Sequence, residues 1–211
     1  FSSGYAAALG TIPALVGKGD VIILDKLSHA CLVDGARLAG ASLRVFPHNR
    51  LDKLESHLRW AVQSFPTARL LVLVESVYSM DGDRAPLREI VELKEQFGAW
   101  LLVDEAHAIG VVGEQGRGLV DEFRLADRIE VQMGTLGKAL GSAGAYICGD
   151  AVLCEFLVNR ARSFIFSTAP PPHCVAASRA AIELLDSIEG ERLVQKLHDN
   201  TALLGANLSL P

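Results

Sequence analysis

The chain has 211 residues, of which 50% are hydrophobic and 21% are charged, with 19 glycines and 8 prolines. This composition excludes an intrinsically disordered chain, and the length is sufficient for one large domain with a substantial core. The net charge of −5, with the basic residues dispersed, argues against nucleic acid or a membrane surface as a partner and favours small-molecule chemistry.

Six short apolar runs predict the strands of a sheet. Several of them are apolar on both faces, which is typical of buried strands in a mostly parallel sheet. The runs are DVIILD (20–25), SLRVFP (42–47), RLLVLVES (69–76), AWLLVDEA (99–106), RIEVQMGT (128–135) and AGAYICG (143–149).

Helical patterns lie between these runs and after them. Their alternation with the strands predicts a doubly wound α/β fold, in which helices flank the sheet. No repeat or linker separates a second unit, so we expect residues 1–211 to form one domain. The helical patterns are HACLVDGARLAG (29–40), LDKLESHLRWAVQSF (51–65), APLREIVELKEQFG (85–98), AVLCEFLVNRARSF (151–164), PPHCVAASRAAIELLDSIEG (171–190) and ERLVQKLHDNTALLGANL (191–208).

Ligands of parallel α/β sheets bind at the carboxyl ends of the strands. Four polar residues follow predicted strands there: Ser79, Asp104, His107 and Lys138. A phosphate loop around Lys138 is excluded, because the first glycine of GxxxxGK is missing and Ala139 follows the lysine. Lys138 is either a surface lysine whose stem packs on glycines or an amine with a lowered pKa, as a Schiff-base lysine requires.

Asp104 closes the apolar run WLLV, where an unpaired carboxylate is costly, so it needs a cationic partner. The protonated ring nitrogen of pyridoxal phosphate (PLP) would supply one, and a helix N-cap is the equal alternative. His107 is a cap or core residue when taken alone, but beside Asp104 it fits a hydrogen-bonding site residue.

His29 opens a helix directly after the first strand, where its ring lies over an aromatic cofactor or is simply a first-turn polar residue. Ser3, Gly4 and Tyr5 begin an apolar helix, whose free N–H groups form an anion site or are merely capped. The hydroxyl of Thr135 is available to the same phosphate.

Seven ordered blocks carry a family resemblance: FSSGYAAALG, LDKLSHACLVDGARLAGA, VFPHN, VESVYSMDGDRAPL, LLVDEAHAIGVVGEQGRG, GTLGKALGSAGAY and FIFSTAPPP. They resemble the α-oxoamine synthases, PLP enzymes that condense an amino acid with an acyl-CoA and release carbon dioxide. The resemblance implies the aspartate aminotransferase-like PLP fold, with this chain as its large cofactor domain. The chain begins without methionine and stops within a helical pattern, so we expect a segment of a longer protein that lacks complete N-terminal and C-terminal parts.

The resemblance also implies roles for individual residues. Lys138 resembles the Schiff-base lysine, Asp104 the partner of the pyridine nitrogen, and His29 the imidazole stacked on the ring. His107 resembles the residue that bonds the phenolic oxygen, and Ser79 another polar contact to the cofactor.

Gly4 and Tyr5 resemble the phosphate-binding turn of the family, and Thr135 adds its hydroxyl there. Thr168 resembles a residue that reaches the phosphate of the neighbouring subunit. The resemblance therefore implies a homodimer with shared active sites.

The blocks LSHACLVDGARL, GEQGRG and FSTAPPP are most similar to the family members of biotin synthesis. Those members join L-alanine to pimeloyl-CoA or to the pimeloyl carrier protein. The alternatives are glycine C-acetyltransferase, serine palmitoyltransferase and a noncatalytic partner subunit, against which Lys138 argues. A nucleotide-binding module would need GxGxxG after the first strand, and DVIILDKLSHA has none. The arginine for the substrate carboxylate is expected outside this segment.

The cysteines, Cys31, Cys148, Cys154 and Cys174, have neither CxxC pairing nor metal-ligand spacing. We therefore expect no metal site and a reducing, cytoplasmic location. No apolar run approaches the ~20 residues of a membrane span, so no membrane association is expected.

Overall fold

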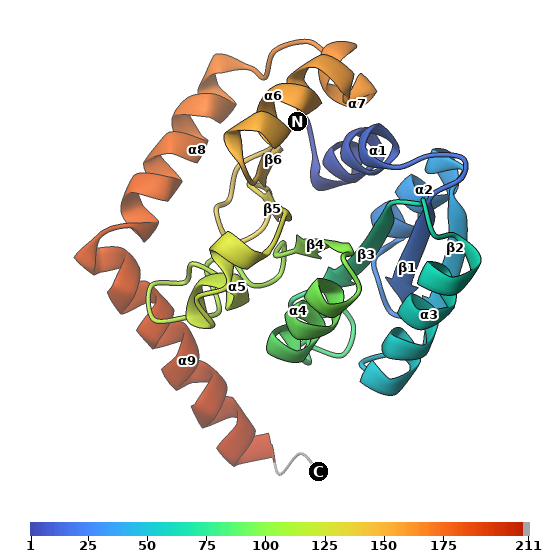
Figure 1. Ribbon diagram of the computed structural model, residues 1–211. Helices are drawn as coiled ribbons and strands as arrows, with labels where there is room; N and C mark the ends of the chain where they lie inside the picture. Colours follow the sequence, from blue (N-terminus) through green and yellow to red (C-terminus); the bar gives the residue numbers. More distant parts are fainter. Residues whose placement is uncertain (209–211) are drawn as a thin grey trace.

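A six-stranded sheet forms the centre of the computed structural model, which describes residues 1–208 (Figure 1). The strand order is β2-β1-β3-β4-β5-β6, and every pair is parallel except β5 with β6. The mostly parallel sheet predicted from the apolar runs is thus confirmed. The strands are β1 (Val21–Asp25), β2 (Ser42–Phe46), β3 (Leu70–Glu75), β4 (Trp100–Asp104), β5 (Val131–Thr135) and β6 (Ala145–Cys148).

Helices connect the strands and continue after the sheet. Two short elements between β4 and β5, α5 and η1, were not among the sequence expectations. The helices are α1 (Gly4–Leu15), α2 (Ala30–Ala39), α3 (Leu51–Ser64), α4 (Leu87–Gln96), α5 (Leu119–Glu122), the 3₁₀ helix η1 (Ala126–Arg128), α6 (Ala151–Arg160), α7 (Arg162–Ile165), α8 (Pro172–Leu185) and α9 (Ile188–Leu208).

Two helix boundaries differ from the sequence expectation. The single helix expected over residues 151–164 is divided into α6 and α7, because Ala161 has an extended backbone. The expected boundary after Gly190 was wrong, since α9 already begins at Ile188. A side chain at Gly190 would collide with the carbonyl oxygens of Leu184 and Leu185, so this glycine permits the tight corner rather than ending a helix.

Both faces of the sheet are buried, because helices pack on each side. Successive residues of a strand point to opposite faces. Val21 and Ile23 of β1 pack in one core with α3 and α4. Ile22 and Leu24 pack in a second core with α1 and α2. The run SLRVFP differs, since β2 lies at the sheet edge and is largely solvent-accessible.

The first turns of α1 and α2 lie at the carboxyl edge of the parallel strands. Helix α2 follows β1, and α1 runs back toward the start of β1. The two helices approach closely at Gly35, where a β-carbon would lie 2.8 Å from the Ile12 side chain and 3.1 Å from the Ala8 carbonyl oxygen. This packing holds two helix N-termini beside the same end of the sheet.

Helices α8 and α9 run along one side of the molecule, and α9 extends beyond the sheet (Figure 1). Each carries few buried side chains, and apolar residues such as Ile182, Leu193 and Leu203 are exposed. Within residues 1–208, no helix combines the length and apolar character needed to cross a bilayer.

We expect Gly35→Ala to destabilise the chain, because the added methyl group must separate α1 from α2. Overpacking of this kind costs about 1–3 kcal/mol. Gly205→Ala on α9 is the matched control: its β-carbon would meet nothing within 4 Å, so it should gain stability from helix propensity. Urea unfolding measures both, and an equal gain in the two variants would contradict the close packing.

Candidate active site

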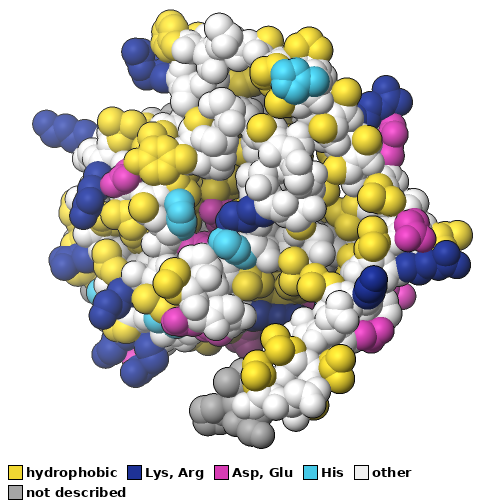
Figure 2. All heavy atoms as spheres, turned by 180° about the vertical axis from the view of Figure 1, so that it is seen from behind, with side chains coloured by type: hydrophobic (Ala, Val, Ile, Leu, Met, Phe, Trp, Pro, Cys, Tyr) yellow, Lys and Arg dark blue, Asp and Glu magenta, His cyan; other side chains and the backbone are white. Residues whose placement is uncertain are grey.

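A cavity of about 150 Å³ lies where β3, β4 and β5 end and α1 and α2 begin. Figure 2 shows histidines, a basic side chain and acidic side chains together in a hollow of this face. Seven of the nine residues expected at the site line the cavity. The lining residues are Gly4, Tyr5, His29, Cys31, Glu75, Asp104, Ala106, His107, Met133, Gly134, Thr135 and Lys138.

The amine of Lys138 lies 2.6 Å from Nε2 of His107. Lys138 follows β5 in a turn of small residues, and His107 follows β4, so neighbouring strands bring them together. Burial lowers the pKa of the Lys138 amine, although the charges of Asp104 and Glu75 oppose this shift. Burial and the nearby lysine also lower the pKa of His107. The pair therefore favours a neutral amine, which is the form that acts as a nucleophile or base.

Asp104 is the last residue of β4 and is 4% exposed. Its carboxylate accepts the N–H of Ala106 at 2.9 Å, and no Lys or Arg side chain forms an ion pair with it in residues 1–208. Burial raises its pKa, despite that hydrogen bond and the charge of Lys138. A buried carboxylate with this environment favours a cationic ligand group.

Glu75 is a cavity residue that the sequence reasoning missed. It ends β3 directly beside Asp104, in register, and is 1% exposed. Burial, followed by the charge of Asp104, raises the pKa of Glu75 to about 7. The available signal was a carboxylate closing an apolar run, which is the same feature that identified Asp104.

His29 is held at two points at the start of α2. Its backbone N–H donates to Glu75 Oε1 at 2.5 Å. Its ring Nδ1 accepts the N–H of Cys31 at 3.1 Å, so His29 is the N-cap of the helix. An accepting Nδ1 leaves the proton of a neutral imidazole on Nε2. The sequence predicts for His29 either a ring over a cofactor or a first-turn polar residue; in the structure it caps the helix, and its ring also lines the cavity.

The first turn of α1 contributes backbone donors. The side chain of Ser3 caps the helix by accepting the N–H of Ala6 at 3.1 Å. The N–H groups of Gly4 and Tyr5 have no helical acceptor, as expected of a first turn, and both residues line the cavity. The phenol of Tyr5 donates to Asp34 on α2, and this hydrogen bond raises the pKa of Tyr5. These free N–H groups suit an anion.

Thr135 lies next to this turn, since a β-carbon on Gly4 would be 3.9 Å from Thr135 Cβ. The threonine hydroxyl donates to the carbonyl of Gly144 at 3.1 Å and accepts the N–H of Gly137 at 3.3 Å. Its position beside the α1 N-terminus agrees with the expected phosphate contact, and its present hydrogen bonds stabilise the turn that leads to Lys138.

Two of the expected site residues lie outside the cavity lining. Ser79 is exposed in the loop after β3, and Thr168 is exposed in the segment before α8. A larger cavity, of about 960 Å³, lies at the opposite end of the sheet near Trp100 and Phe156. It contains none of the expected site residues, and its position at the start of β4 is not where parallel α/β sheets bind ligands.

The family model for aminotransferase class I and II matches residues 1–210. The chain belongs to this family. Proteins of this family share the α/β arrangement described above, so the fold expected from the sequence is confirmed.

Curated relatives are named 8-amino-7-oxononanoate synthase. The protein from Geobacter sulfurreducens is 52% identical over 203 residues, which cover 96% of this chain and 51% of the relative. The one from Citrifermentans bemidjiense is 49% identical over 209 residues, covering 99% and 53%. The chain therefore spans about half the length of the relatives it matches.

Solved structures point to the same group of enzymes. A serine palmitoyltransferase with PLP is 35% identical, with a TM-score of 0.92. The match covers 99% of this chain and 51% of the serine palmitoyltransferase chain. The 8-amino-7-oxononanoate synthase of Francisella tularensis is 32% identical, with a TM-score of 0.75, and covers 90% and 54%. The resemblance to the α-oxoamine synthases is thus confirmed.

Glu75→Gln should stabilise the chain at neutral pH. Because the folded pKa lies near 7 and the ordinary value is 4.5, the folded state binds more protons between these values, and stability falls as the pH rises through this range. Glutamine keeps the acceptor for His29 and removes the charge, a gain on the order of 1–3 kcal/mol.

Urea unfolding at a series of pH values measures this effect. The exposed Glu155 of α6 provides the control, since Glu155→Gln should leave the pH profile unchanged. If Glu75→Gln leaves the pH dependence of the unfolding free energy unchanged, burial does not raise the pKa of the Glu75 carboxyl.

Proposed function

We propose that this chain is the PLP-binding part of an 8-amino-7-oxononanoate synthase. Such an enzyme condenses L-alanine with pimeloyl-CoA or pimeloyl carrier protein, and it releases carbon dioxide together with CoA or the carrier. The observation that carries the proposal is one cavity in which a buried, unpaired carboxylate faces an amine of lowered pKa beside a helix N-terminus.

The residues of the cavity fit PLP. Asp104 forms no ion pair with a Lys or Arg side chain within residues 1–208, and it would hold the protonated ring nitrogen. The N–H groups of Gly4 and Tyr5, with Thr135, would hold the phosphate. Lys138 supplies the amine for the aldehyde, and the ring of His29 would lie against the cofactor. PLP, when bound, supplies an electron sink for the negative charge that develops at the substrate Cα.

Lys138 has two roles in this proposal. Its amine would hold the aldehyde carbon of PLP, and the free amine would act as the general base for the substrate Cα proton. Both roles need the neutral amine that burial favours. His107, 2.6 Å away, accepts or donates a hydrogen bond at this amine and would also reach the phenolic oxygen. Asp104 would stabilise the proton on the ring nitrogen.

The choice among related activities depends on the relatives rather than on the fold, since the enzymes compared share it. Curated relatives named 8-amino-7-oxononanoate synthase reach 45–52% identity to this chain, whereas the solved Francisella tularensis enzyme of the same name is 32% identical. The serine palmitoyltransferase structures are 35–40% identical. The high identity of the curated relatives supports L-alanine and a pimeloyl thioester over L-serine. The cavity with Lys138 supports a catalytic chain over a noncatalytic partner subunit.

A homodimer with shared active sites belongs to the same proposal. Thr168 lies outside its own cavity and is exposed, as a residue that serves the site of a second copy would be. The large cofactor domain, completed by parts of a longer chain, and the cytoplasmic location also remain proposals. They rest on the half-length match and on the spacing of the cysteines.

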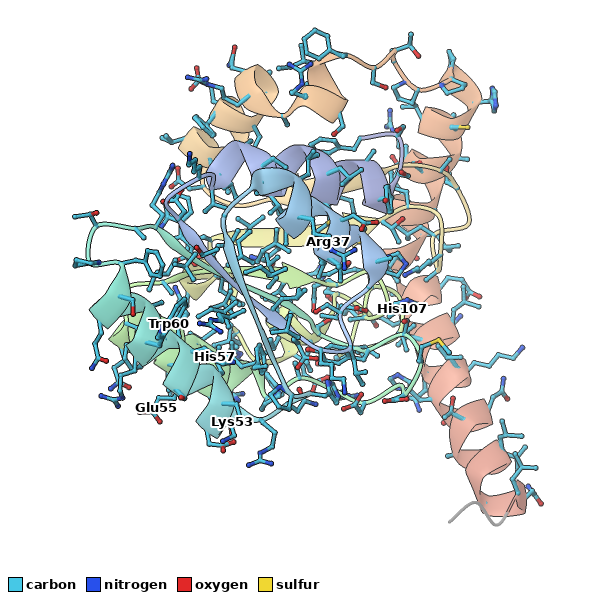
Figure 3. All side chains as sticks on the ribbon, turned by 90° about the vertical axis from the view of Figure 1, so that its right-hand side faces the viewer. Arg37, Lys53, Glu55, His57, Trp60 and His107 are labelled. Atoms are coloured by element: carbon cyan, nitrogen blue, oxygen red, sulfur yellow. The ribbon has the colours of Figure 1, made fainter. Side chains whose placement is uncertain are left out.

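Lys138→Ala should abolish turnover and covalent cofactor attachment in the full-length enzyme. General-base catalysis alone is worth about 10²- to 10⁴-fold. The visible absorbance of the PLP-loaded protein and its turnover are the measurements. Lys53→Ala, an exposed lysine labelled on α3 in Figure 3, is the control and should behave as the unaltered enzyme. If the visible PLP band survives dialysis equally in the unaltered enzyme and in Lys138→Ala, the assignment of the amine is refuted.

The amino acid is tested by adding L-alanine, glycine and L-serine separately to the PLP-loaded, full-length enzyme. L-alanine should change the visible spectrum most and should give product with pimeloyl-CoA or pimeloyl carrier protein. A spectral response and product with glycine but not L-alanine would remove the biotin assignment, while leaving the cofactor assignment intact.

A further inference from the structure

A second polar cluster lies outside the cavity, around His48 in the segment between β2 and α3. The ring Nδ1 lies 2.9 Å from Asp25 Oδ1, and Nε2 lies 2.7 Å from Asp83 Oδ2. The neighbouring Asn49 donates its backbone N–H to Asp25 at 3.0 Å and its side-chain amide to Asp83 at 2.8 Å. The ring also packs edge-on against buried Tyr78, with centroids 4.4 Å apart.

The geometry favours a protonated His48. Ionised carboxylates only accept hydrogen bonds, so a ring that contacts one carboxylate with each nitrogen donates from both and carries a positive charge. The side-chain amide of Asn49, 3.1 Å from Nε2, is the one contact among the described residues that suits an accepting ring nitrogen. Partial burial opposes that charge, but the hydrogen bonds to Asp25 and Asp83 outweigh it and raise the pKa of His48. Tyr78, the other titratable group against the ring, is buried, and its pKa is raised, so it stays neutral.

The cluster joins two segments that border the cavity. Asp25 ends β1, four residues before His29. Asp83 lies in the loop after β3. This loop begins directly after Glu75 and carries Ser79 at its tip. Two backbone hydrogen bonds close the base of this loop. The N–H of Tyr78 donates to the carbonyl of Asp83 at 3.0 Å, and the N–H of Ala85 donates to the carbonyl of Ser76 at 3.0 Å.

The loop has little else to hold its tip. Ser79, Met80, Asp81 and Gly82 are exposed, and Met80 is 90% exposed. Arg84 adds an ion pair with Glu122, which is partly solvent-exposed and so contributes little. Among the described residues, the hydrogen bonds of Asp83 with His48 and Asn49 thus attach the loop, through Asp25, to the end of β1.

We propose that His48 is a positioning residue: as an imidazolium between Asp25 and Asp83, it fixes the loop of residues 76–86 to the end of β1. The clamp is a property of this chain. Its use, to keep Ser79 and Glu75 in place for the cofactor, rests on the proposed function.

The pH dependence follows from the raised pKa. A histidine that gains stability from its charge contributes it fully below its ordinary value of 6.5, and the contribution is lost as the pH rises through the folded pKa. The loop should therefore loosen at high pH. Asp83→Asn should move this loosening to lower pH, since the ring loses one of its two anionic partners.

Hydrogen exchange of the full-length protein, without added cofactor, tests the clamp on peptides covering residues 76–86. Exchange is corrected for its intrinsic pH dependence. His48→Gln should raise the exchange about tenfold, since hydrogen bonds to charged groups are worth more than neutral ones, and should remove the pH dependence. His57→Gln is the control, because His57 lies on α3 (Figure 3) and its side chain forms no hydrogen bond or ion pair among the described residues.

A second measurement, PLP affinity by titration, tests the use of the clamp. His48→Gln and Asp83→Asn should weaken PLP binding, whereas His57→Gln should not. Unchanged exchange in both variants, or wild-type exchange that is flat with pH, would overturn the clamp. Altered exchange with unchanged PLP affinity would overturn its role at the cofactor. If the unaltered protein fails to bind PLP, the proposed function fails, and the exchange result still decides the clamp.

Discussion

The parallel register of β3 and β4 places two carboxylates side by side, and the rest of the site is arranged around them. Glu75 and Asp104 end neighbouring central strands and are almost completely buried. Uncompensated buried charges are costly. Two backbone N–H groups, from His29 and Ala106, and the nearby amine of Lys138 offset only part of that cost. The two carboxylates therefore favour a bound cation.

The helix ends provide the opposite charge at the rim of the same cavity. Helices α1 and α2 present their first turns there, and their close contact at Gly35 fixes how near these turns lie. The N-terminus of a helix carries a partial positive charge and free N–H donors. A negative floor and a positive rim match a ligand that is cationic at one end and anionic at the other. PLP has this distribution, in its ring nitrogen and its phosphate.

Sequence alone predicts much of this arrangement, because the strands are long apolar runs and parallel sheets bind ligands where such runs end. Asp104, His107 and Lys138 all follow this rule. Glu75 obeys it as well, but pairing register cannot be read from one strand, so its place beside Asp104 needed the structure. The exposed positions of Ser79 and Thr168 depend on loop paths, which apolar periodicity does not determine.

The two titrating groups near β3 act on the structure in the same direction. As the pH rises, Glu75 takes up a negative charge beside Asp104, while the clamp at His48 loses its positive charge. Both changes weaken the segment that runs from the end of β3 to Asp83. A bound cationic ring would offset the cost of the first change, because it gives the two ionised carboxylates a cationic partner. Cofactor binding should therefore protect this segment most at high pH, where Glu75 is ionised and the clamp at His48 is weakened.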